Sequence, residues 1–214
     1  MARKFLNGNA ATAYAVKLCR AEVVAAYPIT PQTKIVEKIA ELIADGEMDA
    51  EYIKVESEHS AMSACMGASS TGVRVFTATS SQGLAYMHEM LHYVAGGRFP
   101  VVMAVVNRSL GPPWNIWVDH QDSISNRDTG WIQFYAESAQ EALDATVMAF
   151  KVAEDPGVLT PVMICSDAFI VSHTDEPVEV PVQEEVDAYL PPYRPVNVMD
   201  VDDPKTFCAG VAPD

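Results

Sequence analysis

Short apolar runs alternate with segments of helical periodicity from residue 10 to residue 165, and this alternation restricts the possible folds more than any other feature. Apolar runs predict strands at 23–27, 52–55, 73–78, 100–106 and 161–165. The run at 100–106 is almost wholly apolar, as expected of a strand buried on both faces of a parallel sheet. Strands that alternate with helices predict an α/β fold, in which helices cover both faces of a parallel sheet.

The segments between these runs have the spacing of amphipathic or buried helices. We expect helices at 10–21, 32–44, 58–67, 84–94 and 140–154, and a further strand or extended piece at 131–135. The segment 107–129 differs from them, because it is rich in Gly, Pro, Trp, Asp and Asn and has no sustained period. Connections of this length in a compact domain are often functional.

The composition changes after about residue 173. The stretch 177–195 contains five prolines and an acidic run but little periodicity, which predicts an extended linker on the domain surface. We therefore interpret 1–176 as one domain, 177–195 as a Pro-rich linker, and 196–214 as the start of a second domain that is truncated or missing.

The balance of charge and hydropathy excludes several classes of partner. The 214 residues include 29 acidic and 14 basic side chains, a formal net charge of −15, which disfavours binding to nucleic acid or to an anionic membrane. No run reaches the about 18 to 20 apolar residues of a membrane-spanning helix. The first seven residues also lack the apolar region of a secretion signal. We expect no nucleic-acid partner and no membrane association.

The cysteines indicate a reducing compartment. The chain has four of them and none forms a CxxC pair, so a zinc site or an iron–sulfur cluster in this chain is not expected. Cys19, Cys65 and Cys165 lie in apolar runs, which is typical of small core residues, and the pattern favours a cytoplasmic protein. The fourth cysteine is Cys208.

Glu58 is the strongest candidate for chemistry, because it lies where the strand at 52–55 leads into an apolar helix. Ligands of parallel α/β sheets bind where strands end and helices begin. A carboxylate backed by apolar residues is poorly hydrated, so it must be paired, protonated or chemically active. The alternative is an acid that only interacts with the positive end of the helix dipole. Glu56, two residues earlier, is expected to be a solvated acid.

Five segments come in a fixed order along the chain and together carry a resemblance. They are Tyr-Pro-Ile-Thr-Pro at 27–31, Ser-Glu-His-Ser-Ala at 57–61, Thr-Ala-Thr-Ser-Ser-Gln-Gly-Leu at 77–84, Asn-Arg at 107–108 and Asp-His-Gln-Asp at 119–122. In this order they resemble the first domain of 2-oxoacid:ferredoxin oxidoreductases, most closely the alpha subunit of multi-subunit pyruvate synthases. The resemblance covers nearly all of 5–193.

The resemblance implies a thiamine diphosphate-binding fold, of the type that holds the aminopyrimidine ring of the cofactor. It implies that a different subunit binds the diphosphate and its Mg²⁺. The sequence agrees with this division, because it contains no Gly-Asp-Gly followed by a distant Asn, no P-loop and no GxGxxG. The resemblance also implies [4Fe-4S] clusters on partner subunits.

Three residues take roles from the resemblance. Glu58 aligns with the glutamate that contacts the pyrimidine, where a carboxylate at the ring nitrogen favours the imino tautomer. Arg108 aligns with the substrate arginine, and a guanidinium at a strand end suits a 2-oxoacid carboxylate. Thr30 is implied to lie near the substrate. The alternatives are a loop-anchoring salt bridge of Arg108 to Asp119 or Asp122, and a turn-stabilising hydroxyl at Thr30.

Ser81 and Gln82 follow a predicted strand, and we expect them to line the cofactor pocket; a polar helix start is an equally good interpretation. The acids and histidine at 119–122 are expected to fix the long loop internally. Three metal ligands within four loop residues are geometrically awkward, so we expect no metal.

The implied activity is the reversible oxidative decarboxylation of pyruvate to acetyl-CoA and CO₂, with electrons passing to ferredoxin. The implied partners are a beta subunit with the Mg²⁺–diphosphate site, a gamma subunit, an iron–sulfur delta subunit, ferredoxin, CoA and the 2-oxoacid. Oxobutyrate, oxoglutarate, a branched oxoacid or oxalate stay open as substrates. A transketolase-like or sulfopyruvate decarboxylase-like enzyme also stays open, and so does a non-catalytic assembly fragment.

Overall fold

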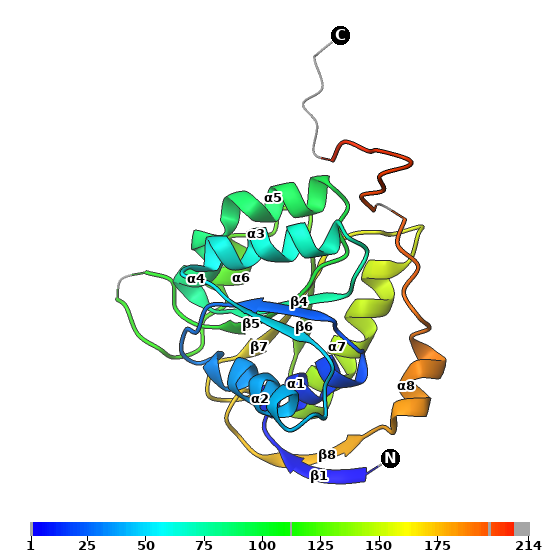
Figure 1. The fold of residues 1–214 in the computed structure, drawn as a ribbon. Coiled ribbons are helices and arrows are strands. Elements are labelled where there is room, and N and C mark those ends of the chain that lie inside the picture. Colours follow the sequence, from blue (N-terminus) through cyan, green and yellow to red (C-terminus); the bar gives the residue numbers. More distant parts are fainter. Residues whose placement is uncertain (1, 112, 197, 208–214) are drawn as a thin grey trace.

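A six-stranded parallel sheet forms the centre of the computed structural model, which describes residues 2–111, 113–196 and 198–207 (Figure 1). The strand order is β3-β2-β4-β5-β7-β6, and every neighbouring pair is parallel. The strands are β2 (Val23–Ala26), β3 (Glu51–Lys54), β4 (Val75–Thr79), β5 (Val102–Asn107), β6 (Ile132–Ala136) and β7 (Val162–Asp167). The prediction of a parallel α/β fold is confirmed.

Helices cover both faces of this sheet, with α3 and α5 on one side and α1, α2 and α7 on the other (Figure 1). The helices are α1 (Gly8–Leu18), α2 (Thr33–Ala44), α3 (Glu58–Ser69), α4 (Ser81–Tyr86), α5 (His88–Gly96), α6 (Gln121–Ile124), α7 (Ala139–Glu154) and α8 (Gln183–Tyr189). The predicted helix at 84–94 is therefore two helices, which meet at Met87.

The central strand β5 is buried along its whole length, as its apolar sequence predicted. Val102, Ala104 and Val106 pack into the core beneath α1, α2 and α7. Met103 and Val105 pack into the core beneath α3 and α5. Each large apolar side chain buried in this way contributes about 1.5–3 kcal/mol, so the two cores hold the strand ends in fixed positions.

Residues 176–189 are folded onto the domain, which differs from the expectation of an extended linker over 177–195. Strand β8 (Glu176–Val180) pairs in antiparallel fashion with β1 (Ala2–Leu6) as a separate two-stranded sheet. Helix α8 follows it and docks through Asp187, whose carboxylate accepts two hydrogen bonds from Arg20. These contacts join segments more than 160 positions apart, so local periodicity gave no sign of them. The proposed domain boundaries stay a prediction, and residues 208–214 lie outside the described residues.

The carboxyl ends of the parallel strands all lie at one edge of the sheet, where the connecting loops gather. The peptide between Thr30 and Pro31, in the loop after β2, is cis. The loop after β5 leads to α6, which is a single turn. In the part of the chain that the structure describes, no helix has both the length and the apolar character needed to cross a membrane.

Candidate active site

Loops that follow four adjacent strands bring the predicted site residues to one edge of the sheet. Thr30 follows β2, Glu58 follows β3, Gln82 follows β4 and Arg108 follows β5. Their order across the edge is the strand order, β3-β2-β4-β5. A parallel sheet thus collects residues that are up to 78 positions apart in the sequence.

Arg108 is buried and holds two of the other predicted residues. Its Nη1 donates to the backbone oxygen of Thr30 at 2.6 Å, and its Nη2 donates to Oε1 of Gln82. The residue is only 5% exposed, and its Nε has no hydrogen-bond partner among the described residues. Burial lowers the pKa of Arg108, and the nearby Asp122 carboxylate partly opposes that shift.

The alternative for Arg108, a salt bridge to a loop acid, is not formed within the described ranges. Its guanidinium makes no ion pair there with Asp119, Asp122 or another acid. The backbone N–H of Arg108, rather than the side chain, donates to Asp122 at 3.0 Å. The ring of Trp114, a residue that is 62% exposed, lies 5.7 Å from the Arg108 Cζ. A buried cation without a carboxylate partner is a suitable group for binding an anion.

Thr30 enters this arrangement through its backbone, since its carbonyl oxygen, not its hydroxyl, receives the Arg108 hydrogen bond. The role of the Thr30 hydroxyl in substrate binding stays a prediction. Gln82 also donates from Nε2 to the backbone oxygen of Leu110 at 2.5 Å. The hydrogen bonds to Leu110 and from Arg108 together fix the orientation of the Gln82 side chain, whose amide oxygen faces the guanidinium.

Ser81 is fully buried and has a left-handed backbone, with φ at 48°. Its hydroxyl lies 2.7 Å from Oε1 of Gln82 and 2.5 Å from the backbone oxygen of Ser109. A residue with a β-carbon is strained in this backbone conformation, so surrounding contacts must hold Ser81 there. Ser81 and Gln82 are both at the start of α4, as the alternative interpretation proposed, and their role in cofactor binding stays a prediction.

Glu58 is the first residue of α3 and is 8% exposed. The hydroxyl of Ser57 caps this helix by accepting a hydrogen bond from the Ser60 N–H at 3.1 Å. No hydrogen bond or ion pair joins the Glu58 carboxylate to another side chain in the described part of the protein. Glu56 is exposed and accepts a hydrogen bond from the Ser60 hydroxyl at 2.9 Å, which confirms it as the solvated acid.

Gly83 lies against Glu58 and Thr79 lies against Gly83, and sequence reasoning selected neither as a site residue. A Cβ placed on Gly83 would lie 2.7 Å from Glu58 Oε1 and would also overlap the Thr79 hydroxyl, so only glycine leaves room for both. The Thr79 hydroxyl is buried without a hydrogen-bond partner in the described ranges. Both residues belong to the motif at 77–84. The signal available in the sequence was that each lies within two residues of Ser81, which was already a candidate.

Asp122 fixes the long loop after β5, as expected for the acids at 119–122. This residue is 1% exposed, and its carboxylate accepts hydrogen bonds from four donors. They are the Ser81 N–H, the Arg108 N–H, the Asn107 side-chain amide and the Ser123 N–H. Burial raises the pKa of Asp122, and these four hydrogen bonds oppose that shift.

Metal ligation by the same loop finds no support among the described residues. No group of three or more His, Cys, Asp or Glu side chains there is placed to hold an ion. His120 instead pairs with Asp167 at 2.7 Å.

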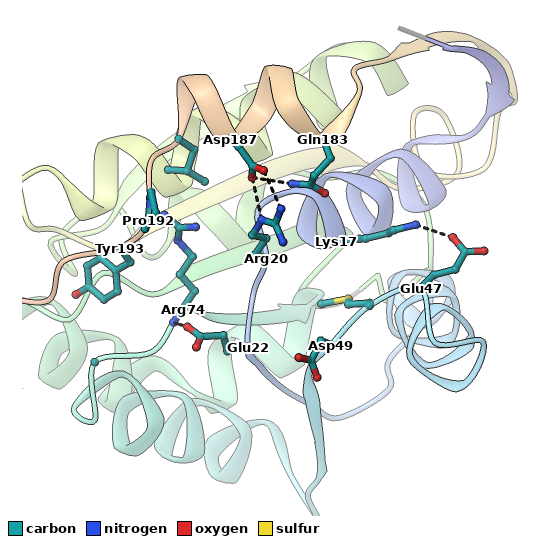
Figure 2. A pocket seen from close by; sticks show the side chains of 13 residues that line it. Lys17, Arg20, Glu22, Glu47, Asp49, Arg74, Gln183, Asp187, Pro192 and Tyr193 are labelled. Atoms are coloured by element: carbon teal, nitrogen blue, oxygen red, sulfur yellow. Dashed lines mark hydrogen bonds and ion pairs between the residues drawn. The ribbon is translucent and has the colours of Figure 1, made fainter.

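A pocket of about 680 Å³ is lined by residues that include Glu22, Asp49 and Arg74 (Figure 2). These residues precede β2, β3 and β4, so the pocket lies at the amino-terminal edge of the sheet, opposite the edge with Glu58 and Arg108. Its cations already have acidic partners. Lys17 pairs with Glu47 at 2.6 Å and Arg20 pairs with Asp187 at 2.8 Å. This pocket therefore lacks the free positive charge that distinguishes the Arg108 site.

Residues 14–214 match the family described as pyruvate flavodoxin/ferredoxin oxidoreductase, thiamine diP-bdg, that is, thiamine diphosphate-binding. The chain is 61% identical over 203 residues to ketoisovalerate oxidoreductase subunit VorA of Pyrococcus abyssi, covering 94% of this chain and 51% of that protein. It is 55% identical over 214 residues to pyruvate synthase subunit PorA of Methanothermobacter thermautotrophicus, covering 100% of this chain and 56% of that protein. The chain thus spans about half the length of the curated relatives it matches.

A solved structure has the same fold. It is the 2-oxoglutarate:ferredoxin oxidoreductase from Magnetococcus marinus with 2-oxoglutarate, coenzyme A and succinyl-CoA bound. The TM-score is 0.75 at 23% sequence identity, over 94% of this chain and 34% of that chain.

Proposed function

This chain belongs to the pyruvate flavodoxin/ferredoxin oxidoreductase, thiamine diphosphate-binding family, and we propose that it forms the pyrimidine side of the thiamine site in a 2-oxoacid:ferredoxin oxidoreductase. The proposed reaction is the reversible oxidative decarboxylation of pyruvate, with CoA, to acetyl-CoA and CO₂. The two electrons released pass to ferredoxin through iron–sulfur clusters of a partner subunit. The relatives named for pyruvate and for ketoisovalerate support this class of substrate.

The observation that carries the proposal is the buried Arg108 guanidinium, which has no acidic partner within the described residues. Thr30 and Gln82 each accept a hydrogen bond from one of its terminal nitrogens, and these two bonds fix the plane of the guanidinium. The remaining N–H groups suit a carboxylate, which binds arginine through two parallel hydrogen bonds. Arg108 therefore binds and orients the carboxylate of the 2-oxoacid.

The residues around Glu58 fit an aminopyrimidine. Glu58 is a buried carboxylate without a side-chain partner in the described ranges. Gly83 lies beside it and has no side chain that would displace the carboxylate. When bound, thiamine diphosphate supplies the carbon nucleophile and the electron sink that 2-oxoacid decarboxylation requires. Glu58 holds the proton at the ring nitrogen, and its low exposure strengthens that hydrogen bond by excluding water.

We propose that the Mg²⁺ and the cofactor diphosphate are bound by a beta subunit, and that gamma and iron–sulfur delta subunits complete the enzyme. The acidic sequence without a phosphate-binding loop supports this division. Burial raises the pKa of Cys65 and Cys165 to about 12, so these thiols stay protonated and are poor cluster ligands. Free buried thiols also support a cytoplasmic location.

A branched-chain 2-oxoacid is the second candidate substrate. The observation behind it is that relatives named for ketoisovalerate match at 61% identity, while relatives named for pyruvate match at 62%, so the chain is equally similar to both. Oxobutyrate, oxoglutarate and oxalate complete the set that a test must include. A non-catalytic assembly fragment is disfavoured, because it gives no reason to bury Glu58 and Arg108 without acidic or basic partners.

The test is anaerobic turnover by the complex that copurifies with this chain. Reduction of ferredoxin is followed with CoA and each of pyruvate, oxobutyrate, ketoisovalerate, oxoglutarate and oxalate. We expect the highest kcat/KM with pyruvate. Preferred turnover of ketoisovalerate would replace pyruvate with the branched acid, and a complex with no turnover of any 2-oxoacid would overturn the enzyme assignment.

A further inference from the structure

We infer that Asp122 is a positioning residue for 2-oxoacid binding, an inference that rests on the proposed function. Its Oδ2 accepts the backbone N–H of Ser81 at 2.9 Å and that of Arg108 at 3.0 Å. Ser81 follows β4 and Arg108 follows β5, so one oxygen atom joins the loops of two neighbouring strands. Asp122 is 1% exposed, so water does not compete for these hydrogen bonds.

Asp122 Oδ2 fixes the backbone on both sides of the hydrogen bond between Arg108 and Gln82, which orients the guanidinium. Gln82, which follows Ser81, receives the Nη2 hydrogen bond of Arg108. The N–H of Ser81 and the N–H of Arg108 both point to Asp122. A closed ring of contacts therefore runs from Asp122 through Ser81 and Gln82 to Arg108 and back. A shift of either loop would move the guanidinium relative to Thr30.

Only an ionised carboxylate satisfies the donors around Asp122. Its second oxygen, Oδ1, accepts the side-chain amide of Asn107 at 2.8 Å and the N–H of Ser123 at 2.8 Å. Each oxygen thus receives two donors. An asparagine has one acceptor oxygen, so its NH₂ group would face two other donors and leave them buried and unsatisfied.

Glu58 lies outside this hydrogen-bond ring, and this separates the expected effects on substrate and cofactor. No hydrogen bond links Glu58 to Asp122, Ser81 or Arg108 in the described part of the chain. Loss of the Asp122 carboxylate should therefore weaken oxoacid binding more than it weakens thiamine binding. Outer-shell groups that orient the ligands of metal sites typically contribute about 10- to 100-fold, and we expect an effect of that size here.

The test is Asp122→Asn in the assembled oxidoreductase. We expect the KM for the 2-oxoacid to rise about 10- to 100-fold, with a smaller fall in kcat and a smaller loss of affinity for thiamine diphosphate. The matched control is Asp119→Asn, which removes the same charge from an exposed position of the same loop. Asp119→Asn should keep the wild-type KM.

A second substitution provides a rescue. In Asp122→Asn combined with Asn107→Asp, the amide NH₂ introduced at position 122 donates to the carboxylate introduced at position 107. The amide oxygen at position 122 again accepts from Ser81 and Arg108. The Ser123 N–H still faces the new NH₂ group, so we expect a partial rescue, with a KM between those of Asp122→Asn and the wild type.

Two kinetic outcomes count against the positioning role. A KM that the Asp122→Asn substitution leaves unchanged would overturn the inference. So would an equal loss of thiamine and oxoacid affinity without rescue, because this is the outcome of a merely structural role.

Amide hydrogen exchange on the full chain separates this inference from the proposed function. Asp122→Asn should accelerate exchange at the N–H groups of Ser81 and Arg108, with no change in Asp119→Asn. Unchanged exchange at both amides would overturn the positioning role whatever the substrate. Accelerated exchange in the variant, beside a wild-type complex that turns over no 2-oxoacid, would support the positioning of Arg108 and overturn only the proposed function.

Discussion

The guanidinium of Arg108 donates to the backbone oxygen of Thr30 at 2.6 Å, across a separation of 78 residues. These residues follow β5 and β2, which lie on either side of β4 in the sheet. Gln82, after β4, accepts the second hydrogen bond of the same guanidinium. Arg108 thus links three neighbouring loops at the edge of the sheet where we propose that the 2-oxoacid binds.

Arg108→Lys should raise the KM for the 2-oxoacid by about 10²-fold, because an ammonium cannot keep both internal hydrogen bonds and also bind a carboxylate in parallel. Steady-state kinetics of the anaerobic complex measures this. Arg127→Lys, at an exposed arginine, is the control and should behave as wild type. An unchanged KM in Arg108→Lys would contradict the carboxylate-binding role.

Glu58→Gln should slow exchange of the C2 proton of bound thiamine by about 10²–10⁴-fold, because an amide cannot hold the proton at the ring nitrogen. Quenched-flow exchange in deuterium oxide, followed by NMR of the released cofactor, measures the rate. Glu56→Gln provides the matched control, since that acid is exposed and lies two residues earlier. Similar exchange rates in the two variants would exclude Glu58 as the pyrimidine contact.

Gly83→Ala should reduce activity more strongly than it reduces stability, because its methyl group would lie 2.7 Å from Glu58 Oε1 and displace the carboxylate. The comparison is Gly67→Ala, where nothing lies within 4 Å of the added carbon. That variant should keep full activity and gain helix stability of about 0.5–1 kcal/mol. Thermal melting and turnover of both variants give the result, and an active Gly83→Ala would show that the Glu58 position is not critical.

Arg74→Met should destabilise the fold by about 3–5 kcal/mol, since it leaves Glu154, whose side chain is only 9% exposed, without its partner. The guanidinium donates to both Glu154 oxygens, at 2.7 and 2.8 Å, and to the backbone oxygens of Cys19 and Pro191. Arg20→Met, which removes an exposed pair with Asp187, should cost only about 0.2–1 kcal/mol. Urea denaturation of the two variants measures the difference, and equal losses would contradict a special role for the buried pair.

The same Arg74→Met variant should have a distinctive pH dependence. Burial already raises the pKa of Glu154, and Arg74 opposes that shift, so its loss raises the pKa further. A carboxyl with a raised pKa in the folded state loses stability as pH rises from its unfolded pKa through its folded pKa. The deficit relative to wild type should therefore be larger at pH 8 than at pH 5. A deficit that grows on acidification would contradict this assignment.

The parallel sheet and its helical covering could be predicted from neighbouring residues alone, because burial on two faces and helical periodicity are local patterns. Glu58 could also be selected in this way, since the carboxyl end of a strand is recognisable along the chain, whereas the role expected for Arg108 came from the family resemblance. The break in the helix at Met87 and the folding of 176–189 were not predicted. The first lies within a continuous apolar pattern, and the second depends on pairing with the distant strand β1.

The contacts between particular atoms at the site, in contrast, became known only from the three-dimensional arrangement. The order of the strands in the sheet brings Thr30, Gln82 and Arg108 together and gives Asp122 its four donors. It also places Gly83 against Glu58. A local pattern fixes which residues of a strand or helix are buried, because burial follows the period of that element. The partners of a buried polar group depend on neighbouring strands, and these can come from anywhere in the chain.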